Sequence, residues 1–264
     1  MYDFAYHRPT SLADAVKLLG ADKEAKALAG GQTLIPTLKQ RLAKPSGLVD
    51  LGGVAELKGI KLAGKTLTVG AGVTHAEVAA SADVQKAIPA LAQLAGQIGD
   101  AQVRNRGTLG GSIANADPAA DYPAALLGLG ATVKTNKREI KGDEFFKGLF
   151  QTALADGEIV VSVSFPVPDK AAYAKFPQPA SRFALVGAFV SKTGANVRVA
   201  VTGAGASVFR LPGMEQALAK SFAPAAIENI KVETAHLNED MHATRAYRAH
   251  LVNVLARRAV AAAG

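Results

Sequence analysis

Residues 29–36 read Ala-Gly-Gly-Gln-Thr-Leu-Ile-Pro, and residues 108–115 read Thr-Leu-Gly-Gly-Ser-Ile-Ala-Asn. Each stretch sets a glycine pair among small and hydroxyl-bearing residues, beside a predicted strand and before an apolar segment. Glycine has no Cβ and tolerates positive φ, so the backbone can approach a ligand closely and direct N–H groups toward it. A run of such amides before a helix is typical of an anion site. We expect the two loops to hold one diphosphate from two sides.

Each loop taken alone also allows a simpler interpretation, because a glycine pair between a strand and a helix is often only a turn. Neither loop has the three spaced glycines of the dinucleotide fingerprint or the lysine of the P-loop. The second loop is the more distinctive because of its neighbours. Residues 103–107 read Val-Arg-Asn-Arg-Gly before it, and residues 116–121 read Ala-Asp-Pro-Ala-Ala-Asp after it.

Together the two stretches resemble the paired motifs of the FAD-binding medium subunits of molybdenum hydroxylases, the carbon monoxide dehydrogenase and xanthine dehydrogenase family. Residues 29–36 are similar to the family motif Ala-Gly-Gly-Gln/His/Thr-Ser/Asp-Leu-Leu/Ile-Pro. Residues 104–121 are similar to Arg-Asn-x-Gly-Thr-Ile/Leu-Gly-Gly-Asn/Ser, followed by a Pro and an Asp. Residues 4–12 and 179–184 also look like family segments, so the resemblance runs nearly end to end. The departures are mild: Thr33 for Ser, Leu109 for Ile and Ser112 for Asn.

The resemblance implies an α+β fold. It would consist of a two-part, PCMH-type (vanillyl-alcohol-oxidase-like) FAD-binding domain and a small α+β C-terminal domain. We expect residues 1–55 to form the first FAD-binding subdomain, 56–175 the second, and 176–264 the C-terminal domain. Residues 169–181 are rich in alanine, proline and lysine and are expected to be a connection.

The same resemblance implies an oxidoreductase subunit that transfers electrons. It would pass them from two [2Fe–2S] clusters in a small partner subunit, through non-covalent FAD, to an external acceptor. The molybdenum cofactor would lie in a large partner subunit, in a dimer of heterotrimers. Two alternatives stay open: a self-sufficient FAD-dependent oxidoreductase of the same flavin fold, and a non-enzymatic phosphate- or nucleotide-binding module.

Composition narrows the class of protein. The chain has 264 residues, 49% hydrophobic, with no apolar run of about 18 residues and no visible secretory signal, so we expect a soluble cytoplasmic protein without a membrane span. It has no cysteine, which excludes thiolate-held clusters within this chain. The net charge is +8, but the basic residues are scattered, with five Tyr and no Trp for base stacking. We therefore do not expect nucleic-acid binding.

Hydrophobic periodicity predicts the elements around the loops. Ser11 begins a helix, residues 25–28 form a short buried strand, and Leu34, Leu38 and Leu42 form the apolar stripe of the next helix. Residues 100–121 show little periodicity and are expected to be a long functional loop. The remaining segments predict hairpins at residues 60–69 and 183–202, strands at 132–135 and 159–165, and helices near 90–98, 213–220, 223–230 and 243–262.

Several residue types suit FAD. Backbone amides of residues 30–34 and 109–113, with nearby hydroxyls, would bind the diphosphate. Asp121 would bind a cofactor hydroxyl or instead cap the helix after it, and Leu28 and Ile98 would form apolar walls or be core. Arg104 and Arg106 would lie near the phosphates, pair with carboxylates or face a partner. The predicted cofactor-binding residues are Leu28, Ala29, Gly30, Gly31, Gln32, Thr33, Leu34, Ile35, Ile98, Thr108, Leu109, Gly110, Gly111, Ser112, Asp121 and Lys175.

No acid–base pair or metal site stands out in the sequence. His75 follows a threonine with capping-box spacing, and the three C-terminal histidines lack carboxylates at compelling spacings. We expect ordinary surface or hydrogen-bonded histidines. In a flavoprotein the cofactor supplies the redox chemistry, so this chain needs no catalytic side chain of its own.

Overall fold

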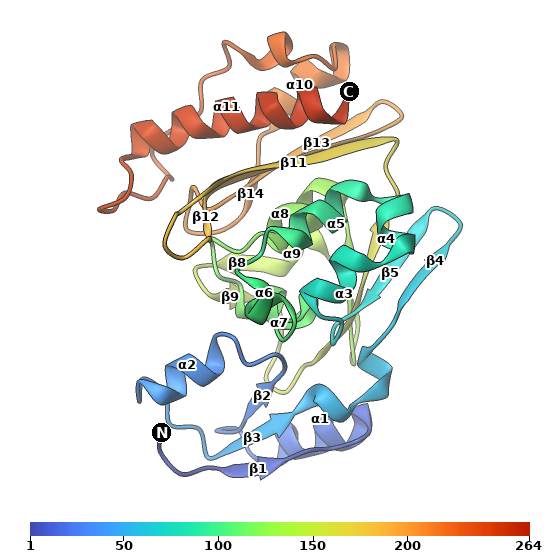
Figure 1. Cartoon of the computed structure of the whole chain (residues 1–264), viewed down its shortest axis with the longest axis vertical. Helices are drawn as coiled ribbons and strands as arrows, with labels where there is room; N and C mark the ends of the chain where they lie inside the picture. Colours follow the sequence, from blue (N-terminus) through green and yellow to red (C-terminus); the bar gives the residue numbers. More distant parts are fainter.

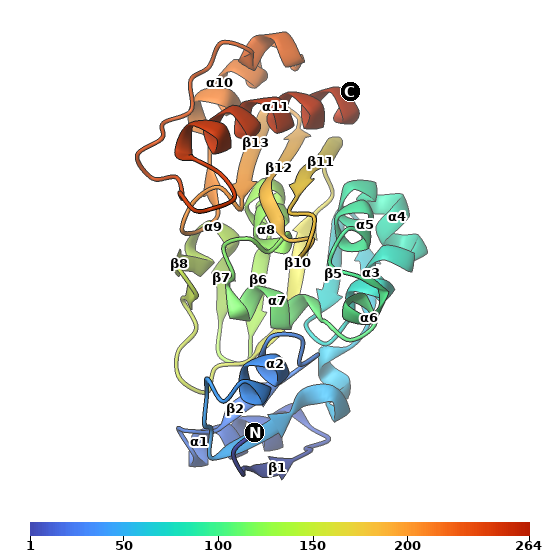
Figure 2. The ribbon, with the colours of Figure 1, turned by 60° about the vertical axis from the view of Figure 1, so that its left-hand side comes forward.

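The computed structural model describes residues 1–264, arranged as three layers along the long axis of the molecule (Figure 1). An N-terminal layer lies at one end, a central layer follows, and a C-terminal layer lies at the other end; a second view shows the same order (Figure 2). Each layer combines a sheet with helices, as expected for an α+β protein. None of the helices combines the length and apolar character needed to cross a bilayer.

The N-terminal layer is a three-stranded parallel sheet in the order β1-β3-β2. The predicted strand at residues 25–28 is present as β2, but its side chains are exposed or half-buried, because it lies at the sheet edge. The Ser11 hydroxyl accepts from the Asp14 N–H and caps α1 as predicted. The elements are β1 (Ala5–His7), α1 (Leu12–Ala21), β2 (Lys26–Leu28), α2 (Leu34–Lys39), β3 (Gly47–Asp50), η1 (Leu51–Gly53) and η2 (Ala55–Leu57).

The central layer is a five-stranded antiparallel sheet in the order β4-β5-β10-β6-β7. Helices α3, α4, α5, α7 and α8 pack with this sheet to form the largest hydrophobic core. The predicted hairpin is β4–β5, and the predicted Thr74–Glu77 capping box opens α3. The elements are β4 (Ile60–Ala63), β5 (Thr66–Gly70), α3 (His75–Ala80), α4 (Ala82–Ala87), α5 (Pro89–Gly96), α6 (Ala101–Arg104), α7 (Leu109–Asn115), α8 (Tyr122–Leu129), β6 (Thr132–Thr135), β7 (Glu139–Lys141), α9 (Gly142–Phe145), β8 (Phe146–Gly148), β9 (Gln151–Thr152) and β10 (Val160–Pro166).

The C-terminal layer is a four-stranded antiparallel sheet in the order β11-β12-β13-β14. Helix α11 packs on one face, and α8 of the central layer contacts β12 and β13. Strand β12 is therefore almost entirely buried. The elements are β11 (Lys170–Pro177), β12 (Ala184–Thr193), β13 (Asn196–Thr202), β14 (Phe209–Arg210), α10 (Pro212–Lys220), η3 (Pro224–Ile227) and α11 (Arg245–Ala263).

Three local predictions are wrong, and the helix predicted near residues 223–230 is only the short 3-10 helix η3. Residues 169–181 are not a connection, because 170–177 form β11, paired along its whole length with β12. Residues 100–121 are not one loop: they contain α6 and α7, each begun by a side-chain cap, from Asp100 and Thr108. The stripe ending at Leu42 stops early, since α2 ends at Lys39 and Leu42 is 73% exposed.

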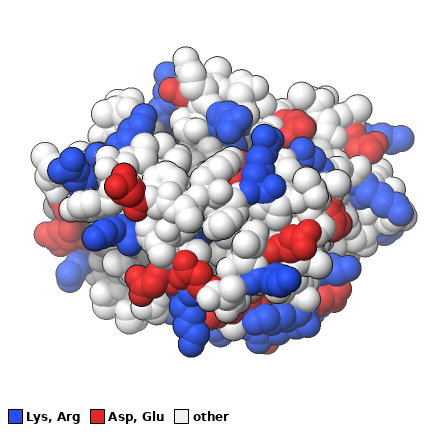
Figure 3. Space-filling model, turned by 90° about the horizontal axis from the view of Figure 1, so that it is seen from below, with Lys and Arg blue, Asp and Glu red and all other residues white.

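The predicted boundary at residue 175 falls inside β11, whereas a division near residue 168 would keep that sheet whole. The division into 1–55, 56–175 and 176–264 stays a prediction. The charges follow the expected scatter on the face seen from below, where positive and negative side chains alternate around an uncharged middle (Figure 3).

Glu158 joins the start of β10 to the β6–β7 hairpin. Its carboxylate has no exposed side-chain surface and accepts hydrogen bonds from Thr135 Oγ1 at 2.7 Å, Arg138 Nε at 3.1 Å and the Ala155 N–H at 2.8 Å. Burial alone raises the pKa of Glu158, but these hydrogen bonds outweigh it and lower the pKa to about 2. The network therefore stabilises the fold only while the carboxylate is ionised.

We expect Glu158→Gln to lower the free energy of unfolding at pH 7 by at most about 3 kcal/mol. Because the pKa is lowered from 4.5 in the unfolded chain to about 2, the contribution is complete above about pH 4.5 and disappears toward pH 2. Urea unfolding of wild type and variant at pH 7 and pH 2.5 measures this. Glu139→Gln, at an exposed position, is the control; a wild-type-to-variant gap of equal size at both pH values would contradict the prediction.

Candidate functional site

A cavity of about 850 Å³ lies where the N-terminal and central layers meet. Its walls come from the β2–α2 loop, the η1–η2 segment, the β5–α3 connection and the α6–α7 loop. Phe150, in the β8–β9 turn, and residues 181–183, between β11 and β12, also line it. Segments from all three layers therefore contribute to one cavity.

The two glycine loops meet in this cavity, as predicted. A Cβ on Gly30 would collide with the backbone oxygen of Arg106 and lie 2.7 Å from the Cα of Gly107. A Cβ on Gly111 would lie 3.5 Å from the Cβ of Ala29. The first loop thus packs against the second through backbone that only glycine leaves open. Gly31 adds a left-handed turn, with φ at +73°.

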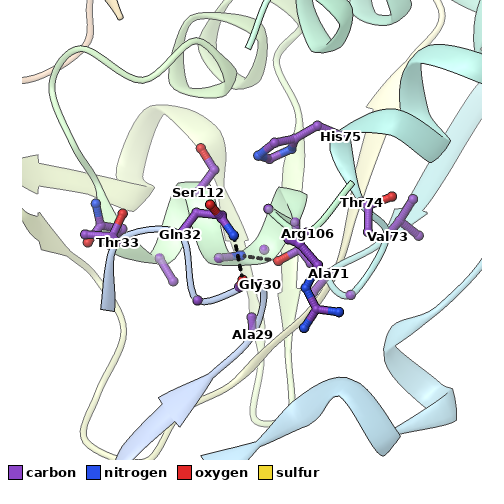
Figure 4. A pocket seen from close by; sticks show the side chains of 18 of the residues that line it. Ala29, Gly30, Gln32, Thr33, Ala71, Val73, Thr74, His75, Arg106 and Ser112 are labelled. Carbon is purple, nitrogen blue, oxygen red and sulfur yellow. Dashed lines mark hydrogen bonds between the residues drawn. The ribbon is translucent and has the colours of Figure 1, made fainter. Parts of the chain in front are cut away.

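The N–H groups of residues 30–34 have no hydrogen-bond acceptor within the chain. The next N–H along the chain, that of Ile35, does have an acceptor: it donates to the Gly31 oxygen at 3.0 Å. Residues 30–34 all line the cavity, and Figure 4 shows Gly30, Gln32 and Thr33 among them. Consecutive unpaired amides at a helix start attract an anion, because free donors and the helix dipole act together. The predicted free amides of the first loop are therefore present, and their binding to a diphosphate stays a prediction.

The expectation that the second loop also offers free amides is wrong. The N–H groups of Leu109 and Gly110 donate to the backbone oxygens of Val73 and Ala71 at 3.0 and 2.9 Å. That of Gly111 donates to Thr108 Oγ1 at 3.1 Å, and that of Ser112 to the Thr108 oxygen at 3.0 Å. These amides hold α7 against the β5–α3 connection, so the second loop supplies shape rather than free donors.

Among the hydroxyls proposed to help, Thr108 is occupied as the α7 cap. Thr33 and Ser112 line the cavity, and their hydroxyls make no hydrogen bond within the chain. The Gln32 side chain donates weakly to the Gly30 oxygen at 3.4 Å. The polar side chains of the two loops that are available to a ligand are therefore those of Gln32, Thr33, Ser112 and Asn115.

Asp121 begins α8 and makes no capping hydrogen bond. Its two carboxylate oxygens lie 2.9 and 3.0 Å from Lys175 Nζ, and one accepts from the Tyr173 hydroxyl at 2.6 Å. Burial raises the pKa of Asp121, and the Lys175 ammonium opposes that effect. Lys175 also donates to the Gln97 oxygen at 3.2 Å. The pair joins the central layer to β11, and both ions are satisfied by the protein itself.

Ile98 lies in a turn whose backbone carbonyls accept hydrogen bonds from the Arg104 side chain. Arg104 donates to the oxygens of Ile98 and Gly99 at 3.1 and 3.0 Å, so its guanidinium is used within the protein. Of the two arginines proposed near phosphates, only Arg106 lines the cavity. The apolar side chain of Ile98 is fixed at the cavity wall.

The structure brings most predicted residues to the cavity. The predicted residues that line it are Ala29, Gly30, Gly31, Gln32, Thr33, Leu34, Ile98, Thr108, Gly110, Gly111, Ser112 and Asp121. Four predicted residues do not line it: Leu28, Ile35, Leu109 and Lys175. Leu28 and Ile35 pack at Gly31, Leu109 is fully buried, and Lys175 is bound to Asp121. Direct contact of any of them with FAD stays a prediction.

Sequence reasoning missed several lining residues. Leu57, Val73 and Ile159 add apolar wall, Arg182 adds positive charge, and His75 adds a buried imidazole. Burial, with the charge of Arg104 adding to it, lowers the pKa of His75 to about 4, so the ring is neutral near pH 7. Arg182 lies in the family-like stretch 179–184, whereas Leu57, Ile159 and the neighbouring Val73 and His75 carry no sequence signal for a cavity, because only the fold brings these parts of the chain together.

These features fit an elongated cofactor with a diphosphate. The free amides and the two free hydroxyls suit phosphate oxygens, and the apolar walls suit an aromatic ring. The site therefore defines a protein that binds an anionic, nucleotide-type cofactor between its N-terminal and central layers.

Comparison with known proteins specifies that class. Residues 2–168 match the FAD binding domain in molybdopterin dehydrogenase. The nicotine 6-hydroxylase medium subunit of Paenarthrobacter nicotinovorans is 36% identical, over 98% of this chain and 96% of the relative. The carbon monoxide dehydrogenase medium chain of Hydrogenophaga pseudoflava is 32% identical over the same shares. Quinoline 2-oxidoreductase from Pseudomonas putida 86 superposes with a TM-score of 0.90 at 32% identity, covering 99% of this chain and 97% of that one.

The chain therefore belongs to the FAD-binding medium subunits of the molybdenum hydroxylases. FAD is its cofactor, and the chain is a component of an oxidoreductase. The predicted family and fold class are confirmed.

We expect Gly30→Val to abolish FAD retention, because the side chain would force the first loop away from the Arg106–Gly107 backbone. Flavin absorbance per chain after gel filtration measures retention. Gly213→Val is the matched control, because a Cβ there meets nothing within 4 Å. Full flavin content in the Gly30 variant would contradict the packing of the two loops.

We expect Asp121→Asn and Lys175→Met each to lower the free energy of unfolding by about 3–5 kcal/mol, because each leaves a buried charge unpaired. The double variant should lose clearly less than the sum of the single losses. Urea unfolding of the apo chain measures this without FAD. Glu239→Gln, which breaks the exposed pair with Arg245, is the control; strictly additive losses would show that Asp121 and Lys175 are not coupled.

Proposed function

We propose that this chain is the electron-transfer subunit of a molybdenum hydroxylase complex. It takes electrons from [2Fe–2S] clusters in a partner subunit and delivers them through FAD to an external acceptor. The observation that carries this proposal is the run of unpaired amides at residues 30–34, in a cavity built by an FAD-binding domain. Bound there, FAD would supply two-electron and one-electron chemistry that no side chain offers.

The chain's own residues would hold the cofactor in distinct ways. The amides of residues 30–34 would bind the diphosphate without a formal positive charge. Thr33 and Ser112 would add hydroxyl donors, and Ile98, fixed through its carbonyl by Arg104, would form an apolar wall. No covalent link is needed, so we propose non-covalent FAD.

The partners follow from what the chain lacks in sequence and from its relatives. It has no cysteine, so any iron–sulfur cluster must be held by another chain. Its relatives are named medium chains or subunits of dehydrogenases. We propose a large molybdenum-cofactor subunit and a small iron–sulfur subunit as partners, in a dimer of heterotrimers in the cytoplasm.

In the purified full-length chain we expect FAD to be released by acid and recovered unmodified in the supernatant. The photoreduced flavoprotein should pass electrons to an artificial dye, while no organic substrate of the complex should bleach the flavin in the isolated chain. The same substrate should bleach it once the two partner subunits are present. Stopped-flow absorbance measures both reactions.

Bleaching of the isolated chain by an organic substrate would instead support the self-sufficient oxidoreductase. A colourless chain that cannot be reconstituted with FAD would contradict both and favour a phosphate- or nucleotide-binding module.

A further inference from the structure

His75 is the first residue of α3, directly after the capping Thr74. Its N–H donates to the Gly107 oxygen at 2.9 Å, which ties the start of α3 to the α6–α7 loop. The side chain is only 4% exposed, yet it lines the cavity. Figure 4 shows the ring extending from α3 toward the side of the cavity where Gln32 and Ser112 lie.

Neither ring nitrogen of His75 has a hydrogen-bond partner in the chain. Nδ1 is fully buried, beside the ring of Tyr122 at a centroid distance of 5.3 Å. Nε2 lies over Gly107, where a Cβ would come within 2.6 Å of it. A buried polar side chain without a partner is uncommon in native proteins and calls for a specific explanation.

We propose that His75 is a further FAD-binding residue, whose Nε2 hydrogen-bonds an uncharged polar group of the bound cofactor, such as a hydroxyl or a ring carbonyl. This inference rests on the proposed function. Three observations carry it: the burial of the ring, the absence of any partner for Nε2 within the chain, and its position in the cavity wall.

The chemistry of the ring selects the kind of group. Burial keeps the imidazole neutral, so Nε2 offers either one donor or one acceptor, depending on the tautomer, and no charge. The amides of residues 30–34 already supply the donors for the diphosphate. A neutral ring next to them is suited to the uncharged part of the cofactor.

Two measurements test this role. In the wild-type full chain with ¹⁵N-labelled histidine, the Nε2 resonance of His75 should shift when FAD is added to the apo protein. Flavin fluorescence quenching should give a Kd about five- to tenfold higher for His75→Phe, and His75→Gln should recover part of the affinity.

Tyr122→Phe is the matched control, because the Tyr122 hydroxyl is equally buried and unpartnered but does not line the cavity. Its Kd should equal that of the wild type. If the wild type binds FAD but Nε2 does not shift and His75→Phe binds equally well, the inference is overturned while the proposed function stands. If the wild type does not bind FAD, the proposed function fails first. Should His75→Phe not fold, the wild-type resonance alone decides.

Discussion

The site depends on five consecutive backbone N–H groups that the fold leaves without acceptors. They lie in the loop from β2 to α2, and the fold holds that loop in place by packing Gly30 directly on the backbone of Arg106 and Gly107. Unpaired amides are costly when removed from water unless an anion or solvent satisfies them. The two glycine loops therefore differ in role: the first offers free N–H donors, and the second holds the first in place by packing against it.

The support is built from ordinary secondary structure. Helix α7 is fixed because its first amides bond to the β5–α3 connection and to its own cap, Thr108. The same region carries the His75 ring and the Arg104-bound turn of Ile98. Rigid walls of this kind hold a cofactor in one geometry.

The C-terminal layer is joined to the central layer by polar contacts, of which the Lys175–Asp121 pair is buried and the Arg198–Asp143 pair partly exposed. Lys175 on β11 pairs with Asp121 at the start of α8, and Arg198 on β13 donates to the Leu127 oxygen and pairs with Asp143. Because α8 also packs on β12 and β13, the two layers share apolar as well as polar contacts. The loop that brings residues 181–183 to the cavity is thus attached to a firmly held sheet.

Much of this arrangement could be predicted from sequence, and the failures have physical causes. Amphipathic helices and hairpins carry their own periodic signal, and the glycine motifs indicated the cavity-forming loops. Strand β11 was missed because its alanines and lysines have low strand propensity and its pairing with β12 comes from tertiary structure. Helices α6 and α7 were missed because each is short and depends on a single cap.

The sequence also could not predict that the first loop has free amides while those of the second are already hydrogen-bonded. The acceptors that occupy the Leu109 and Gly110 amides are carbonyls of Val73 and Ala71, in a distant part of the chain. Likewise, nothing local distinguishes His75 from a surface histidine, because its burial comes from Gly107 and Tyr122.

Amide hydrogen exchange followed residue by residue in the apo and FAD-bound chain tests the central claim most directly. We expect fast exchange for residues 30–34 in the apo chain and strong protection when FAD binds, with residues 109–112 protected in both states. Tight FAD binding that left the amides of residues 30–34 exchanging as before would contradict their role as the diphosphate donors.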